Sequence, residues 1–261
     1  LSGTYLYHCA QMCALIKPGD VVLDIGCGPA SLLLQLARLN PRAEFIGADL
    51  SASMLEVGRE SIRQQGIDNV ELREEDMTRL AGIADRSVDV VISSMALHHL
   101  ADLSQLEATF RNIARVLRND RAIYLNDFGR LKSVESVDYF VSRASDGADQ
   151  ATLLDYRNSL LAAFSREEFQ TLAASYLGPC AKVYSTAVSP LMMVVRTPKR
   201  RCVAAMKDEF RRRFEQARQE ARQQQGEAFD SAAFESIESK RNILDGMVDN
   251  VLMALVAERE G

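Results

Sequence analysis

The sequence has no hydrophobic run of the roughly 18–20 residues that a helix needs to cross a bilayer. It also lacks a basic stretch interleaved with aromatic residues, and its formal net charge is -5, which disfavours a dedicated nucleic-acid-binding protein. Arginines do cluster near 199–213, which leaves an RNA or an acidic protein as an alternative partner for that segment. The visible N-terminus lacks the pattern of a signal peptide, so we expect a cytoplasmic protein without a membrane span.

Cysteine is sparse, and its distribution excludes a disulfide framework. The five cysteines are odd in number and scattered, which indicates free thiols in a reducing compartment. Cys9 and Cys13 are one helical turn apart and can share a helix face, and we interpret them as small buried residues. A metal or arsenic site would need further ligands nearby, and none stands at a standard spacing. The sequence therefore predicts no metal site.

Alternation of hydrophobic runs with helical patterns dominates the first part of the chain, which is typical of a parallel α/β sheet. Ser51 and Ser165 are expected to begin helices as N-caps. Two β-rich runs near the end of this part, separated by Ser189 and Pro190, indicate a closing hairpin. Strands are expected at 21–26, 44–49, 70–73, 88–93, 122–127, 181–188 and 191–197, and helices at about 31–39, 52–65, 103–117 and 166–176.

Two segments depart from this alternation. Residues 129–164 look helical, carry several aromatic side chains and are too long for a simple connection, so we expect them to form a cap over the site. Residues 199–261 are rich in charge with apolar stripes at spacings of three and four. They form either a helical pair packed on its own domain, a homodimerisation element or a site for a protein partner. We accordingly divide the chain into a domain at 1–198 and a helical extension at 199–261.

A buried strand runs into a glycine turn at 21–30, with Asp24 two residues before the first glycine. Glycine lets such a turn be tight and lets a ligand lie against bare backbone, as in nucleotide sites of open α/β sheets. A carboxylate here would repel the pyrophosphate of a dinucleotide, but it suits the sulfonium and ammonium groups of S-adenosylmethionine. Gly26 and Gly28 are followed by Ser31, so the dinucleotide fingerprint is also incomplete.

Three further segments follow in order, each at the end of an expected strand: 47–51 (Gly-Ala-Asp-Leu-Ser), 75–77 (Glu-Asp-Met) and 88–94 with the turn at 95–100. With Asp24-Ile25-Gly26-Cys27-Gly28, they resemble the motifs of class I S-adenosylmethionine-dependent methyltransferases, of the small-molecule type related to the ubiquinone and menaquinone methyltransferases. The resemblance covers roughly 15–197. It implies a doubly wound, mostly parallel seven-stranded Rossmann-like sheet, here with a C-terminal helical extension.

The resemblance also implies the cofactor, S-adenosylmethionine, and the residues that would hold it. The backbone of the first motif would hold the methionine moiety, Asp49 the ribose hydroxyls, and Asp76 the adenine amino group, with Met77 packing the ring. Asp24 either contacts the ligand directly, braces the loop or acts through water. The full expected set is Asp24, Gly26, Cys27, Gly28, Asp49, Leu50, Met54, Asp76, Met77, Ser93 and Ser94.

Candidate catalytic residues follow the fourth and fifth strands. His98 and His99 stand where the fourth strand opens onto the site, and histidine exchanges protons near neutral pH. Either is a general base, or the pair braces the loop and contacts the substrate. Asn126 and Asp127 end the fifth strand and face the same crevice, with Asp127 expected to contact the substrate.

The expected reaction is in-line transfer of a methyl group to an O, N, S or C nucleophile of a small, partly apolar substrate. A nicotinamide-dependent oxidoreductase is an alternative, as is a non-catalytic scaffold that retains the cofactor fold. A third alternative is an enzyme that methylates a peptide or protein recruited by 199–261. The sequence leaves the substrate and the acceptor atom open.

Overall fold

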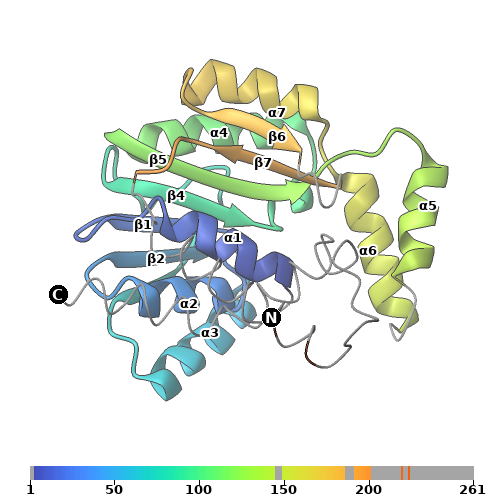
Figure 1. Cartoon of the computed structure of the whole chain (residues 1–261). Helices are drawn as coiled ribbons and strands as arrows, with labels where there is room; N and C mark the ends of the chain where they lie inside the picture. Colours follow the sequence, from blue (N-terminus) through green and yellow to red (C-terminus); the bar gives the residue numbers. More distant parts are fainter. Residues whose placement is uncertain (1–2, 145–148, 186–190, 201–218, 220–222, 224–261) are drawn as a thin grey trace.

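Seven strands form one sheet in the order β3-β2-β1-β4-β5-β7-β6 (Figure 1). This computed structural model describes residues 3–144, 149–185 and 191–200, together with 219 and 223. The first five strands are parallel, whereas β7 runs antiparallel to both β5 and β6, which confirms the predicted fold class. The strands are β1 (Val21–Ile25), β2 (Glu44–Asp49), β3 (Val70–Glu74), β4 (Val88–Ser94), β5 (Leu117–Phe128), β6 (Lys182–Ser185) and β7 (Met192–Arg196).

Helices cover both faces of the sheet, because alternate residues of each strand point to opposite sides. Val22, Val90 and Tyr124 belong to the core beneath α1 and α2, and neighbouring residues such as Val91 and Ile123 belong to the core beneath α4 and α7. Parallel strands buried on both faces are expected to be mostly apolar, as β1 is apart from Asp24 and as β4 is over Val90–Ile92. The helices of these layers are α1 (Gly3–Cys13), α2 (Ser31–Leu39), α3 (Ala52–Gln65), α4 (Leu103–Val116) and α7 (Arg166–Leu172), which a π-helical turn at Ala173–Leu177 extends.

The fifth strand begins earlier than the sequence indicated. We expected a turn at Asn119 and Asp120 and a strand from 122, but β5 starts at Leu117, directly after α4. The polar residues at 118–120 are exposed, so they lack the apolar signal by which the other strands are found. The pairing with β4 is irregular between Val88 and Val90, where the two strands first meet.

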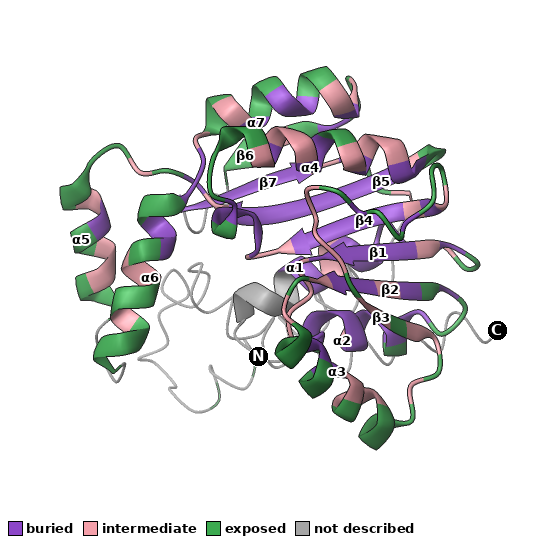
Figure 2. Cartoon of the chain, turned by 180° about the vertical axis from the view of Figure 1, so that it is seen from behind, coloured by how far each residue is buried: buried purple, intermediate pink, exposed green. Residues whose placement is uncertain are grey.

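The segment at 129–164 forms two helices, α5 (Val134–Arg143) and α6 (Gln150–Ala162), which stand beyond the carboxyl end of β5 (Figures 1 and 2). They enclose a small core of their own that includes Val137 and Leu160. The two ends of the segment meet, because Gly129 bridges Phe164 and Arg130 N donates to Phe164 O at 2.9 Å. This segment is hereafter the cap.

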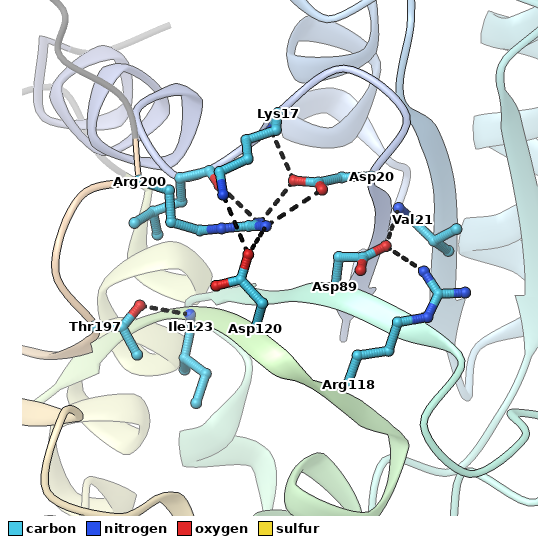
Figure 3. Close-up of polar contacts among 10 residues, drawn as sticks. Lys17, Asp20, Val21, Asp89, Arg118, Asp120, Ile123, Thr197 and Arg200 are labelled. Atoms are coloured by element: carbon cyan, nitrogen blue, oxygen red, sulfur yellow. Dashed lines mark hydrogen bonds and ion pairs between the residues drawn. The ribbon is translucent and has the colours of Figure 1, made fainter.

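The opposite, amino-terminal edge of the sheet carries a cluster of ion pairs (Figure 3). Arg200, 9% exposed in its side chain, donates to Asp20 Oδ2 at 2.7 Å and also pairs with Asp120 at 3.3 Å. Its backbone N–H donates to Ala14 O at 3.1 Å. Lys17 adds a more exposed contact to Asp120 at 3.1 Å. The cluster thus attaches Arg200, where the continuously described chain ends, to the loop before β1.

Among the described residues, no helix is both long enough and apolar enough to cross a membrane. Cys9 and Cys13 are buried in α1, as predicted, and within the described part of the chain they form no disulfide, nor do Cys27 and Cys180. The expectation for Cys202 falls outside the described residues, and so does the helical extension except for residues 199, 200, 219 and 223. The same holds for 186–188, so the first strand of the closing hairpin is seen only as β6.

Candidate active site

The glycine turn after β1 lies against the ends of β2 and β4. Gly26 and Gly28 both have positive φ, at 70° and 53°. Gly26 N and Cys27 N donate to Ala48 O at 2.7 and 3.1 Å, which fastens the turn to β2. A Cβ on Gly26 would lie 2.3 Å from Ala96 Cβ, so only glycine fits there, whereas the space beside Gly28 is open to 4 Å. The turn therefore presents bare backbone and free space, as a ligand cradle requires.

Asp49 joins this turn to the end of β2. Its Oδ2 accepts from Gly28 N at 2.7 Å, and its Oδ1 accepts from Ser51 N at 2.8 Å. Ser51 in turn caps α3 by accepting from Met54 N, which confirms it as an N-cap. A carboxylate has about four acceptor positions, so two remain for a ligand. This geometry suits the two vicinal hydroxyls of a ribose.

Asp24 lies one strand residue before the turn and is buried, with 2% of its surface exposed. Burial raises the pKa of its carboxyl to about 8, and the charge of Asp49 adds to the effect. No hydrogen bond to its side chain is found among the described residues. Burial and the two carboxylates also raise the pKa of the Cys27 thiol, which is therefore neutral at pH 7. Asp24 therefore keeps its proton below about pH 8, and a cationic ligand placed beside it would favour its ionised form.

Asp76, in the motif at 75–77 that follows β3, braces the turn in which it lies. Asp76 Oδ1 accepts from both the N–H and the hydroxyl of Thr78, at 2.8 and 2.7 Å, and Arg79 lies 3.8 Å from Oδ2. Met77 reaches Gly26, where its Cε would lie 3.0 Å from an added Cβ. Leu50 and Met54 are 70% and 47% exposed beyond the end of β2. Large apolar side chains exposed in this position can cover the apolar part of a ligand.

The two serines that end β4 differ in environment. Ser93 is fully buried and its hydroxyl donates to Ile25 O at 2.8 Å, so it ties β4 to β1. Ser94 is half-buried and accepts from Asn126 Nδ2 at 3.2 Å. Met95 follows with φ of 58°, which is uncommon for a large side chain, and marks the sharp turn out of the strand. Ser94 is therefore the more accessible of the two serines.

His98 and Asp127 form a buried pair at the same edge. His98 Nδ1 lies 2.6 Å from Asp127 Oδ1, and the side chains are 5% and 2% exposed. Asp127 also accepts from Leu97 N at 2.6 Å, His98 N at 3.3 Å and Phe128 N at 2.6 Å. The carboxylate is thus occupied in holding the short helix at Leu97–His99, rather than facing the crevice alone. It also orients the His98 ring so that Nε2 is the nitrogen left to exchange a proton.

Aromatic side chains connect this pair to the cap. Phe128 lies with its ring centre 5.3 Å from that of His98 and 5.7 Å from that of Tyr156 on α6. His99 is exposed and packs its ring 4.2 Å from His98. Tyr156 is one of the aromatic side chains noted in 129–164, whereas Phe128 lies just before that segment and was not predicted. Its position directly after Asn126 and Asp127 could have signalled it.

The N-terminal helix covers the sheet from the side of α2. His8 Nδ1 lies 2.7 Å from the hydroxyl of Tyr124 on β5, and both residues are buried. Burial lowers the pKa of His8 to about 4, so its ring is neutral at pH 7. His8 thus has a structural role, because it joins α1 to β5. The side chains of Tyr5 and Tyr7 are outside the described residues.

The family of the chain follows from its match to known proteins. Residues 16–161, more than half of the chain, match the family model described as Methyltransferase domain, and the chain belongs to that family. The predicted resemblance to class I S-adenosylmethionine-dependent methyltransferases is thereby confirmed, together with the enzyme class and the cofactor of that class. This membership sets aside the nicotinamide-dependent alternative. Residues 206–261, of which the structure describes only 219 and 223, match a second model, SurA-like N-terminal domain.

Two curated relatives each match less than half of the chain. Demethylmenaquinone methyltransferase of Lactobacillus johnsonii is 32% identical over 107 residues, which cover 40% of this chain and 42% of that protein. Arsenite methyltransferase of Halobacterium salinarum is 30% identical over 115 residues, which cover 44% of this chain and 28% of that protein. The matched region therefore spans less than half the length of either relative.

Solved structures extend the likeness across the fold. The plantazolicin methyltransferase BpumL, solved with a triazolic desmethylPZN analogue and SAH, has a TM-score of 0.56 and 16% identity, covering 76% of this chain and 83% of that one. A SAM-dependent methyltransferase from Aquifex aeolicus has a TM-score of 0.53 and 16% identity, covering 72% and 86%. At these identities the likeness concerns the fold alone.

Proposed function

We propose that this protein transfers a methyl group from S-adenosylmethionine to a small, partly apolar acceptor bound under the cap. One observation carries the proposal: Asp49 joins the glycine turn to β2 beside the buried, unpaired carboxyl of Asp24. The turn and the two remaining acceptor positions of Asp49 fit a ligand that has a ribose but no phosphate. The carboxyl of Asp24 fits a ligand with cationic groups, because a nearby cation favours its ionised form.

The cofactor half of the site would be built from β1, β2 and β3. The turn at Gly26 and Gly28 would hold the methionine moiety, with Asp24 favouring its ammonium group. Asp49 would bind the ribose hydroxyls, and exposed Leu50 with Met77 would cover the base. When bound, S-adenosylmethionine supplies a methyl group on a sulfonium, which passes to the acceptor by in-line displacement.

The acceptor half would lie at the ends of β4 and β5, where the cap begins. His98, oriented by Asp127, would take a proton from an acceptor that reaches the site protonated. Phe128 and Tyr156 would pack the apolar body of the acceptor. Since the sulfonium charge disappears during transfer, the protein contributes mainly by aligning the reactants and excluding water. The buried His98–Asp127 pair and the aromatic wall serve both purposes.

The test is a calorimetric titration with S-adenosylhomocysteine. Wild type should bind in the micromolar range, and Asp49→Ala should lose roughly tenfold or more in affinity because ribose hydrogen bonds to a carboxylate disappear. Asp68→Asn, a change at an exposed acid before β3, is the matched control and should bind as wild type does. Wild type that does not bind, or Asp49→Ala that binds equally, would contradict the proposed cofactor site.

A further inference from the structure

The carboxyl edge of the sheet divides into two halves at β1. The cofactor residues proposed above come from β1, β2 and β3, which lie on one side of the sheet order. The next strands on the other side are β4 and β5, and the cap follows β5 directly. Ligands of open α/β sheets bind outside the carboxyl ends of the strands, where the strand order reverses. An acceptor held under the cap therefore lies over the ends of β4 and β5.

Asn126 stands at this place with an unused hydrogen-bonding atom. The residue is 1% exposed, and its Nδ2 donates to Ser94 Oγ at 3.2 Å. Its Oδ1 is buried and has no hydrogen-bond partner. Among the described residues, Arg200 Nε at the opposite edge of the sheet is the other side-chain atom in this condition. A buried carbonyl oxygen without a donor is unfavourable, and native proteins rarely contain one.

The neighbours of Asn126 use its amide nitrogen but not its amide oxygen. Strand alternation places it on the same face as Tyr124, and it lies opposite Val194 in β7 and Ser94 in β4. An apolar side chain would satisfy these neighbours without leaving an oxygen unpaired. Local features that oppose stability are expected at functional sites. Phe128, two residues further on the same strand, carries the aromatic wall that continues to Tyr156.

We propose that Asn126 positions the methyl acceptor, and that its Oδ1 accepts a hydrogen bond from an O–H or N–H group of that acceptor. The acceptor is then a flat, largely apolar molecule with a hydrogen-bond donor, such as a phenol or an aromatic amine. Its ring packs against Phe128 and Tyr156 while the donor reaches Asn126. This inference rests on the proposed function, because the cofactor half defines which end of the crevice remains for the acceptor.

The test compares two probes that differ only in the donor. Full-length protein saturated with S-adenosylhomocysteine is titrated with 2-naphthol and with 2-methoxynaphthalene, for wild type and for Asn126→Leu. Wild type should bind 2-naphthol about tenfold more tightly, the effect of one hydrogen bond to an otherwise unpaired atom. Asn126→Leu should bind both probes with equal affinity. Asn126→Ala, which cannot overfill the site, should behave in the same way.

A second buried asparagine provides the matched control. Asn40 is also 1% exposed, but its Nδ2 donates to Leu36 O at 2.7 Å, at the C-cap of α2. Asn40→Leu should lower the melting temperature and keep the preference for 2-naphthol. Asn126→Leu should not lower the melting temperature, because it removes an unpaired oxygen together with a single hydrogen bond.

Several outcomes would overturn the inference. These are equal affinity of wild type for the two probes, binding of neither probe, and a preference that persists in both Asn126 variants. A fall in melting temperature for Asn126→Leu as large as that for Asn40→Leu would assign Asn126 a structural role instead. Wild type that fails to bind S-adenosylhomocysteine would refute the proposed function itself, so the two failures are distinguishable.

Discussion

At the scale of single residues, Asp24 links the ligand site to stability. Its native pKa of about 8 lies above the ordinary value of 3.8. Between these two pH values the folded protein keeps a proton that the unfolded chain has released. The free energy of unfolding must therefore fall as pH rises through this window, and it levels off above the native pKa.

We expect Asp24→Asn to remove this pH dependence. One proton corresponds to a slope of at most about 1.4 kcal/mol per pH unit, so the variant should gain stability relative to wild type from pH 5 to pH 8. Urea unfolding at each pH unit measures the difference. Asp68→Asn, on an exposed loop residue, should run parallel to wild type. Parallel curves for Asp24→Asn as well would show that Asp24 is ionised in the folded protein.

The same carboxyl should make cofactor binding depend on pH. An ammonium group near Asp24 favours its ionised form, so the affinity for S-adenosylhomocysteine should rise from pH 6 to pH 8 with release of a proton. Calorimetry in two buffers of different ionisation enthalpy measures that release. In Asp24→Asn the released proton should be absent and the affinity should not rise. Proton uptake by wild type on binding would be incompatible with this assignment.

At the scale of secondary-structure elements, Asp127 organises the turn that leaves β4. A single carboxylate accepts from three backbone N–H groups and from the ring of His98, which lies 29 positions away in sequence. These contacts hold the short helix at Leu97–His99 against the end of β5. The position and orientation of His98 therefore depend on β5, although His98 follows β4 in the sequence.

Asp127→Asn should destabilise the protein by about 2 kcal/mol or more. The amide keeps one acceptor oxygen and turns a donor toward backbone N–H groups, and hydrogen bonds to charged groups contribute more than neutral ones. Urea unfolding measures the loss. Asp138→Asn, at an exposed ion pair with Arg157, should change stability by less than about 0.5 kcal/mol. A loss for Asp127→Asn no larger than that of this control would contradict the bracing role.

Elements were predictable from sequence where burial and pattern agree. The apolar runs of β1, β2 and β4 and the capping box at Ser165 are local signals, and the structure confirms them. The start of β5 was missed because three exposed polar residues carry no strand pattern. The cap was predicted as helical, yet its division into α5 and α6 depends on packing of the two helices against Phe128, which a single sequence does not show.

The sequence predicted where the site residues lie, but it did not predict which hydrogen bonds their side chains make. Asp49 is placed by its motif, and the structure adds that its two oxygens bind Gly28 and Ser51. Ser93 was expected to hold the cofactor, but its hydroxyl is used between strands. Pairing of His98 with Asp127 joins two motifs that are apart in sequence, so it required the sheet order. Direct contacts with cofactor and acceptor stay predictions for all of these residues.

At the scale of the whole molecule, Arg200 closes the described domain at the edge away from the site. It is bound to Asp20 of the loop before β1 and to Asp120 of β5, and it also donates to Leu15 O at 3.2 Å. The boundary expected at 198 thus lies two residues before a side chain that belongs to the domain. Homodimerisation through 199–261, its binding to a protein partner, and cytoplasmic location stay predictions.

Arg200→Ala should cost roughly 3 kcal/mol, because it leaves the Asp20 carboxylate, 8% exposed, without its charged partner. Thermal and urea unfolding of the full chain measure this loss. Lys17→Ala is the control, since its pair with Asp120 is exposed at 41% and 80% and should contribute less than about 1 kcal/mol. Combining Arg200→Met with Asp20→Asn should recover part of the loss. Equal losses of stability in Arg200→Ala and Lys17→Ala would contradict this role of Arg200.

The bridge between Gly129 and Phe164 also bears on how such a protein can change over evolutionary time. Because the two ends of the cap meet, its 130–163 segment leaves and re-enters the domain at one point, and the strand pairings of the sheet do not pass through it. A lineage can therefore replace this one contiguous stretch of gene, and with it the chemistry of the acceptor, while the cofactor machinery is inherited unaltered.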